Sequence, residues 1–151
     1  MTPSKENQKM STKPHTVLFV CVKNGGKSQM AAALMRHHAG DTVEVHSAGT
    51  RPGTAINAQS AAAIAELGAD MSSAIPHPVS PELLRSVDQV IVLGDEAVIE
   101  PVEGMSAPVT TWHTDEPSRR GIEGMERMHL VRDDIDRRVR ALLEDLRVHR
   151  D

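Results

Sequence analysis

The chain has 151 residues, of which 39% are hydrophobic and 25% charged, as expected for one folded domain. Its 17 Lys and Arg against 21 Asp and Glu give a net charge of −4, which argues against a nucleic-acid binder, because such proteins need clustered positive charge. No apolar run approaches the ~18 residues of a membrane span, and we expect neither a membrane anchor nor a signal peptide. The single cysteine excludes an intramolecular disulfide and a cysteine-rich zinc site, so we expect a cytoplasmic protein without a bound metal.

The first half of the chain alternates strand and helix patterns. Residues 1–15 are polar and are predicted to be a flexible tail ahead of a single domain over residues 16–151. The apolar, β-branched run Thr16–Val22 predicts a strand buried on both faces. A Gly-containing turn then leads into Ser28–His38, which is rich in good helix formers, and Val43–Ala48 predicts a second strand.

Capping and turn signals divide the second half in the same way. The remaining predicted elements are a helix capped by Asn57, a short helix that Ser80 caps and Pro81 opens, strands at Gln89–Leu93 and Pro108–Trp112, and a long helix from about Glu123. Apolar residues three or four positions apart form one stripe on the long helix: Met128, Val131, Ile135, Val139, Leu142 and Leu146. Its charged face, which includes Arg132, is predicted to be solvated. Alternating strands and helices predict an α/β fold with one parallel sheet between helices.

The only cysteine, Cys21, lies at the end of the first predicted strand. Ligands of parallel sheets bind beyond the carboxyl ends of the strands. A Gly-rich turn that enters a helix presents backbone N–H groups, with the helix dipole behind them, to an oxyanion. We call the residues that follow the cysteine the oxyanion loop: Val22, Lys23, Asn24, Gly25, Gly26, Lys27 and Ser28.

The oxyanion loop also favours a reactive cysteine. Lys27 adds positive charge and Ser28 can donate a hydrogen bond to the sulfur, so both stabilise a thiolate. A thiolate beside an oxyanion site is suited to nucleophilic displacement at a tetrahedral oxyanion. A buried, inert cysteine is the alternative. A nucleotide-binding P-loop is another, because Gly26-Lys27-Ser28 matches the second half of that motif, although Cys21 replaces its first glycine.

Residues Cys21–Ala33 resemble the low-molecular-weight tyrosine phosphatase superfamily, whose loop reads C-x5-R-S, and look closest to the arsenate reductases built on that fold. Ser47–Thr50, Gly68–Ser72 and Glu116-Pro117 also match, and the resemblance covers Thr16–Leu146. It implies a three-layer α/β sandwich around a four-stranded parallel sheet.

Two departures from the family pattern narrow the implied chemistry. Lys27 replaces an Arg that would clamp a tetrahedral oxyanion with two parallel N–H bonds. Gly94 stands where thioredoxin-linked relatives have a relaying cysteine. Because arsenate reduction takes two electrons from thiols, the second thiol must come from outside this chain.

The resemblance therefore points to the arsenate–mycothiol transferases, which have a single cysteine. It implies arsenate as substrate, mycothiol or another low-molecular-weight thiol as cosubstrate, and no tightly bound cofactor. A glutaredoxin-like, mycoredoxin-type partner would then release arsenite.

The resemblance also implies residue roles. Cys21 would be the nucleophile or the arsenate-activating thiolate. Glu116, where the family usually has Asp, would protonate a departing oxygen, with Asp115 as its neighbour. A solvated loop pair is the alternative for these acids. Met125 and Met128 could contact the thiol cosubstrate, or they could simply pack in the core.

Three other functions remain open at this point. A phosphatase on the same fold, a nucleotide-binding kinase or ATPase, and a non-catalytic oxyanion-binding module are each compatible with a Gly-rich loop after a buried strand.

Overall fold

The computed structural model describes residues 13–150 of the chain, and the side chains as far as residue 148. Most of the predicted tail lies outside the described residues. The first strand begins one residue before the predicted domain start, at His15, which pairs with Val43 and contacts Gln89 through its ring Nε2 at 3.2 Å.

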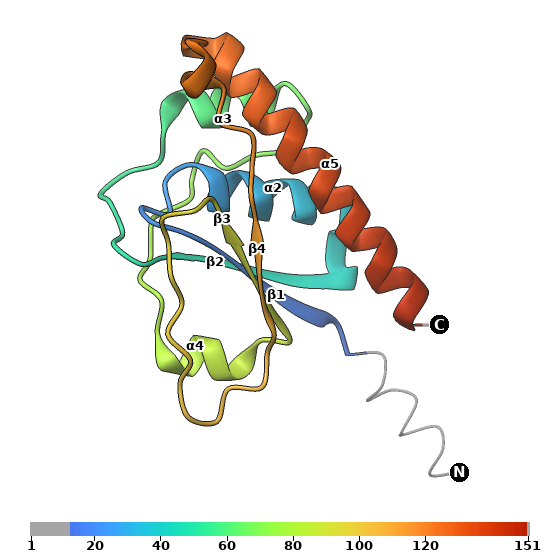
Figure 1. Ribbon diagram of the computed structural model, residues 1–151. Helices are drawn as coiled ribbons and strands as arrows, with labels where there is room; N and C mark the ends of the chain where they lie inside the picture. Colours follow the sequence, from blue (N-terminus) through green and yellow to red (C-terminus); the bar gives the residue numbers. More distant parts are fainter. Residues whose placement is uncertain (1–12, 151) are drawn as a thin grey trace.

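Four parallel strands form one sheet in the order β2-β1-β3-β4 (Figure 1). The strands are β1 (His15–Cys21), β2 (Val43–Gly49), β3 (Gln89–Leu93) and β4 (Val109–Trp112). The chain leaves β1 toward β2 on one side and later returns to build β3 and β4 on the other side. The strand order therefore reverses between β1 and β3, the position at which open parallel sheets bind ligands.

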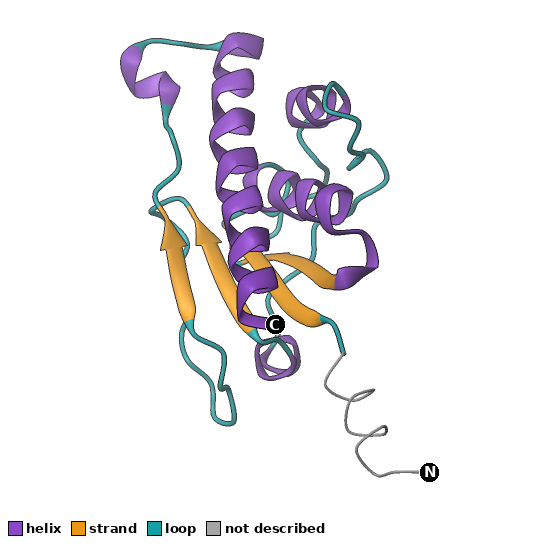
Figure 2. Cartoon of the chain, turned by 90° about the vertical axis from the view of Figure 1, so that its right-hand side faces the viewer, coloured by secondary structure: helices purple, strands orange, loops and turns teal. Residues whose placement is uncertain are grey.

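Helices cover both faces of the sheet, which confirms the predicted three-layer α/β fold (Figure 2). The helices are α2 (Lys27–Ala39), α3 (Ala58–Ala65), α4 (Pro81–Ser86) and α5 (Gly124–Arg150), with short 3-10 turns η1 (Gly40–Thr42) and η2 (Pro117–Arg120). Helices α2, α3 and α5 pack together on one face, and α4 lies on the other. No helix within residues 13–150 is long and apolar enough to cross a membrane.

The central strand β1 is buried on both faces, as its continuous apolar run predicts. Val17 and Phe19 pack in the core beneath α2 and α5, whereas Leu18 and Val20 pack in the core beneath α4. All four side chains are fully buried. Successive side chains of a strand point to opposite faces, so one apolar run serves both cores and holds Cys21 rigidly at its end.

The predicted helix caps are confirmed. The Asn57 side chain accepts a hydrogen bond from the Ser60 amide (2.8 Å), and Ser80 Oγ accepts one from the Leu83 amide (3.1 Å). Each cap satisfies one N–H group that the first helical turn leaves unpaired. Asn57 thereby fixes the start of α3. Segment 51–57, which contacts the oxyanion loop, ends there.

The long helix differs from the prediction in two places. Leu143 is buried at its C-terminal end, whereas Leu142 and Leu146 are only partly buried. Arg132 is 9% exposed, so its predicted place on a solvated face is wrong. Its Nη1 donates to the Ala63 carbonyl (3.0 Å) and to Glu66 (2.9 Å). The last turn of a helix leaves carbonyls unpaired, and Arg132 satisfies one of them where α5 crosses the end of α3.

Candidate active site

Cys21 ends β1 at the switch point of the sheet, and its side chain is 8% exposed. The oxyanion loop curls from it into the first turn of α2, which begins at Lys27. The amides at the start of a helix have no carbonyl one turn back to bond to, so those of Lys27 and Ser28 are open to a ligand. The predicted loop and the predicted nucleophile therefore lie together at one end of the sheet.

The loop is held in place by the segment that follows β2. Four amides of this segment donate to carbonyls of Cys21 and the loop: Thr50 to Cys21 (3.1 Å), Arg51 to Val22 (2.8 Å), Gly53 to Lys23 (2.9 Å) and Asn57 to Gly25 (2.7 Å). The N–H and C=O groups of a trans peptide point in opposite directions, so the intervening amides face away from this segment. The Asn24 amide, for example, donates to Cys21 Sγ at 3.3 Å. The loop thus turns N–H groups toward the sulfur.

Two glycines permit this close approach. A Cβ atom at Gly49 would lie 2.6 Å from the Val22 carbonyl oxygen, and one at Gly25 would lie 2.8 Å from the Ala55 carbonyl oxygen. Asn24 adopts a left-handed conformation with φ of 55°, which Asn tolerates better than most residues. The Ser47–Thr50 motif found in the sequence therefore contributes backbone, through Gly49, to the wall of the loop.

A buried chain of hydrogen bonds directs the Ser28 hydroxyl to the sulfur. Asn24 Oδ1 accepts from the His77 amide (2.9 Å) and from Gln29 Nε2 (3.2 Å), so Asn24 Nδ2 is left to donate to Ser28 Oγ (2.7 Å). Ser28 Oγ lies 2.9 Å from Cys21 Sγ. Because the hydroxyl already accepts from Asn24, its own proton is available for the sulfur, and this stabilises a thiolate.

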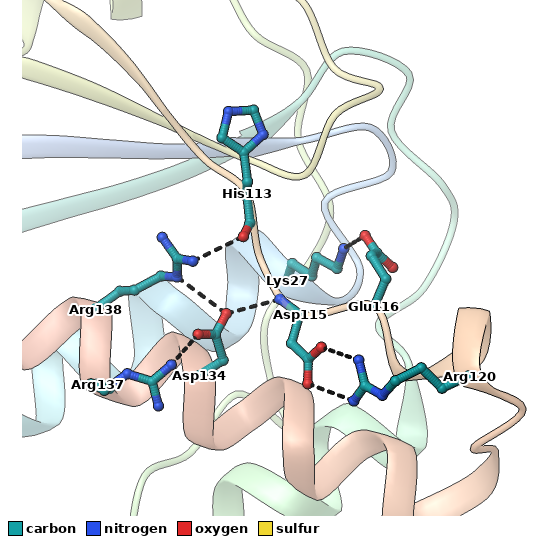
Figure 3. A network of polar contacts seen from close by, with 8 residues as sticks. All are labelled: Lys27, His113, Asp115, Glu116, Arg120, Asp134, Arg137 and Arg138. Carbon is teal, nitrogen blue, oxygen red and sulfur yellow. Dashed lines mark hydrogen bonds and ion pairs between the residues drawn. The ribbon is translucent and has the colours of Figure 1, made fainter.

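The predicted acid Glu116 contacts the predicted cation Lys27. Lys27 Nζ donates to Glu116 Oε1 at 2.6 Å, and the two side chains are 24% and 29% exposed (Figure 3). Both residues line a cavity of about 290 Å³ that Cys21 also lines. Glu116 Oε2 takes no part in the contact with Lys27. The predicted nucleophile, the predicted cation and the predicted acid thus line one cavity.

Asp115 points elsewhere. Its carboxylate accepts two hydrogen bonds from Arg120, at 2.7 and 3.1 Å, and these bonds hold its pKa below the usual range of aspartic acid. Its amide donates to Asp134 Oδ2 (2.9 Å), which anchors this loop to α5. Figure 3 shows Asp115 and Glu116 turned in different directions. Asp115 does not line the Cys21 cavity, so the structure separates the two predicted acids.

Gly94 and Asp95, which follow β3, complete the cavity. Gly94 has φ of 91°, and a Cβ atom there would lie 3.5 Å from Lys27 Nζ. Asp95 Oδ1 lies 2.6 Å from His113 Nδ1, and this hydrogen bond lowers the pKa of the Asp95 carboxyl. Gly94 therefore places no side chain beside the Lys27 ammonium.

Sequence reasoning missed several residues of this site, among them Glu96, which lines the cavity. Gln29 orients the Asn24 amide, and the sequence showed it only as part of the Cys21–Ala33 resemblance. Arg119 also lines the cavity, and no spacing pattern indicates it. Within residues 13–148, no three His, Cys, Asp or Glu side chains are grouped so that they could hold a metal ion.

A family model, curated relatives and solved structures all give consistent matches. The model of the family described as low molecular weight phosphotyrosine protein phosphatase matches residues 16–151. An arsenate reductase of Bacillus licheniformis is 32% identical over 135 residues, which cover 85% of this chain and 95% of that protein.

Two of the matching solved structures are arsenate reductases. The thioredoxin-dependent arsenate reductase of Corynebacterium glutamicum has a TM-score of 0.75 and 31% identity, and the match covers 95% of this chain and 67% of that chain. An arsenate reductase in a phosphate-binding state has a TM-score of 0.74 and 25% identity, and the match covers 87% of this chain and 98% of that chain.

Proposed function

Because this chain belongs to the low-molecular-weight phosphotyrosine protein phosphatase family, we propose that it is an arsenate reductase that joins arsenate to a low-molecular-weight thiol. The observation that carries the proposal is the geometry at Cys21. The sulfur receives hydrogen bonds from Ser28 Oγ and the Asn24 amide, and the chain has no second cysteine to take up an oxidised sulfur.

In the first step the oxyanion loop binds arsenate, and Lys27 balances part of its charge. The Cys21 thiolate attacks arsenic, so that an S–As bond forms and one As–O bond breaks. The departing oxygen leaves as water because Glu116 Oε2 gives it a proton. Arsenic remains in the +5 state, and the product of this step is a cysteine–arsenate adduct plus one water molecule.

In the second step the external thiol gives its proton to the Glu116 carboxylate, and its thiolate attacks the same arsenic atom. The new S–As bond replaces the bond to Cys21, which returns as a thiolate. The net reaction consumes one arsenate and one thiol and yields a thiol–arsenate adduct and water. No electron transfer has occurred, and Glu116 is again protonated.

Reduction follows outside this chain. A second thiol attacks the sulfur of the adduct, the two sulfurs form a disulfide, and arsenic receives two electrons and leaves as arsenite. We propose a glutaredoxin-like protein as the partner for this step and mycothiol as the thiol, both from the sequence resemblance. A chain with one cysteine cannot form the intramolecular disulfide that would supply both electrons.

A tyrosine phosphatase is the second candidate, and the family match supports it. Two observations weigh against efficient phosphatase action. Lys27 is a point charge already engaged by Glu116, whereas the family's usual Arg would grip an oxyanion with two parallel bonds. The chain also has no Tyr, and of its two aromatic residues, Phe19 and Trp112, Phe19 is fully buried in the core. The family match gives no support to the P-loop nucleotide-binding alternative.

The proposed function is tested by mixing the protein with arsenate, mycothiol, a mycoredoxin-type protein and its NADPH-dependent reductase. We expect arsenate-dependent loss of NADPH that Cys21→Ser abolishes. No loss with the wild-type protein, or full activity in Cys21→Ser, would contradict the proposal. Rapid release of nitrophenol from an aryl phosphate would favour the phosphatase instead.

A further inference from the structure

A second, larger cavity of about 830 Å³ lies beside the oxyanion loop. Its walls are the segment 51–57, the start of η2 and the first turns of α5. Sites for small molecules typically have volumes of about 300–1,000 Å³, so this cavity can hold a ligand much larger than arsenate. It shares Lys23, Lys27 and Glu116 with the cavity of Cys21, so the two spaces adjoin.

The larger cavity carries positive charge that no other part of the described chain neutralises. Lys23, Arg51 and Arg127 line it, and among the described residues none of their side chains makes a hydrogen bond or an ion pair. Of the acids in the described part of the chain, Glu116 alone lines it, and Glu116 is already bonded to Lys27. In a protein with a net charge of −4, this local excess favours a ligand with oxygen acceptors.

Arg127 gives the most direct indication of a ligand. Its Nε atom is buried and has no hydrogen-bond partner. Buried polar groups in native structures are nearly always satisfied, so an orphaned guanidinium donor calls for an explanation. An acceptor oxygen of a molecule bound in the cavity would supply the missing partner. Arg127 presents five N–H donors in a fixed plane, which suits carboxylate or paired hydroxyl groups.

Apolar side chains form another part of the cavity wall, beside four polar ones: Thr54, Asn57, Ser60 and Ser118. Met30, Ile56, Met128 and Val131 line it, and Met128 is 6% exposed with its sulfur 3.5 Å from Ser60 Oγ. An aliphatic wall with cationic groups around it suits a molecule that combines carbon chain with oxygen-rich groups. Arsenate or phosphate alone would leave this apolar wall unused.

We propose that this cavity binds the body of the thiol cosubstrate, with Arg127 as its specificity-determining residue and Arg51 as a second donor. The shared chemistry of its possible ligands is a set of oxygen acceptors, either sugar hydroxyls, as in mycothiol, or carboxylates, as in glutathione. This proposal rests on the proposed function, because the larger cavity would bind the thiol that receives the arsenic.

The position of Glu116 connects this cavity to the chemistry. A thiol whose body lies in the larger cavity reaches the Cys21 cavity across the Lys27–Glu116 pair, which lines both spaces. Its sulfur then passes the carboxylate that takes its proton in the second step. Gly94, which has no side chain, leaves room for the incoming sulfur beside Lys27.

Binding can be tested without any reaction by calorimetric titration with S-methylmycothiol and S-methylglutathione, which have no free thiol. The proteins are the wild type, Arg127→Met and Arg140→Met, a matched control on the same helix whose 61%-exposed side chain pairs with Asp136. We expect at least one probe to bind the wild type and Arg140→Met alike, and to bind Arg127→Met about tenfold more weakly.

Binding of S-methylmycothiol alone identifies hydroxyl recognition, and binding of S-methylglutathione alone identifies carboxylate recognition. If neither probe binds at millimolar concentration, or if Arg127→Met binds as tightly as the wild type, the proposal is wrong. Arg51→Met, in an exposed segment, repeats the test in case Arg127→Met does not fold.

Kinetics separate this proposal from the proposed function. We expect Arg127→Met to raise the KM for the thiol about tenfold while the KM for arsenate and kcat stay close to those of the wild type. If wild type and variant form the adduct with the same KM for the thiol, the cavity assignment fails and the proposed function stands. If no thiol yields an arsenic adduct although a probe binds, the proposed function fails and the binding site stands.

Discussion

The Ser28 hydroxyl lies 2.9 Å from the Cys21 sulfur and can act as a donor there, because Asn24 Nδ2 already donates to the same oxygen. Asn24 in turn is oriented by the His77 amide and by Gln29. The state of the sulfur therefore depends on residues from the oxyanion loop, α2 and the loop before α4. Substitutions of side chains in this hydrogen-bond network should alter the reactivity of Cys21 without altering the fold.

Ser28→Ala removes the donor to the sulfur. A hydrogen bond to a charged group contributes about 1.5–3 kcal/mol, so we expect alkylation of Cys21 by iodoacetamide at pH 7 to slow by about 10- to 100-fold. The matched control is Ser86→Ala, which loses only a surface bond to the Leu83 carbonyl (2.9 Å). Equal alkylation rates in Ser28→Ala and the wild type would show that the hydroxyl does not stabilise the thiolate.

Gly49→Ala should distort the oxyanion loop, because the added Cβ would lie 2.6 Å from the Val22 carbonyl oxygen. Overpacking of this kind costs about 1–3 kcal/mol, and the loop would lose phosphate and arsenate binding along with stability. At Gly53, an added Cβ would lie 3.8 Å from the nearest side chain, that of Lys23. We therefore expect Gly53→Ala to bind phosphate like the wild type in calorimetry. A Gly49→Ala protein with unchanged phosphate affinity would contradict the close-packing argument.

Glu116→Gln tests the assignment of the proton carrier. The variant keeps the shape of the side chain but cannot protonate the departing oxygen, so we expect kcat to fall by about 10²- to 10⁴-fold. Asp115→Asn is the natural control, because Asp115 bonds Arg120 and lies outside the Cys21 cavity. Steady-state kinetics should give a much smaller loss for Asp115→Asn. A larger loss of kcat in Asp115→Asn than in Glu116→Gln would show that Asp115 is the proton donor.

Glu66 predicts a pH-dependent contribution to stability. Hydrogen bonds from His129 and Arg132 lower the pKa of Glu66 in the folded protein. A lowered carboxyl pKa contributes stability above the unfolded value of about 4.3, and this contribution is lost as pH falls through the folded pKa. Glu66→Gln should therefore lower Tm at pH 7, and the difference from the wild type should shrink toward pH 3. A difference in Tm that is constant from pH 7 to pH 3 would exclude this linkage.

Much of the fold follows from local patterns. The apolar run before Cys21, the caps at Asn57 and Ser80 and the stripe on α5 each depend on neighbours within a few residues. The structure confirms the run, the caps and the stripe as far as Val139. The burial of Arg132 depends instead on where α5 crosses the end of α3, 69 residues away along the chain. No local periodicity contains that information.

The candidate site divides in the same way. The oxyanion loop and its cysteine are contiguous in sequence, so residue chemistry alone predicted Lys27 and Ser28 as site residues. The separation of Asp115 from Glu116 depends on Arg120, which binds the first carboxylate, and on Lys27, which binds the second. The larger cavity at Arg127 forms only where segment 51–57 meets α5, and it could not be inferred from either segment alone.

The central claim is that Cys21 transfers arsenate to an external thiol without being oxidised. Mass spectrometry of the products formed from arsenate and mycothiol, with no redox partner present, tests it most directly. The account predicts a mycothiol–arsenate adduct in the +5 state with the wild-type protein, no adduct above background with Cys21→Ser, and no arsenite until a glutaredoxin-like protein is added. Arsenite formed without the partner, or an adduct formed equally well by Cys21→Ser, would contradict the account.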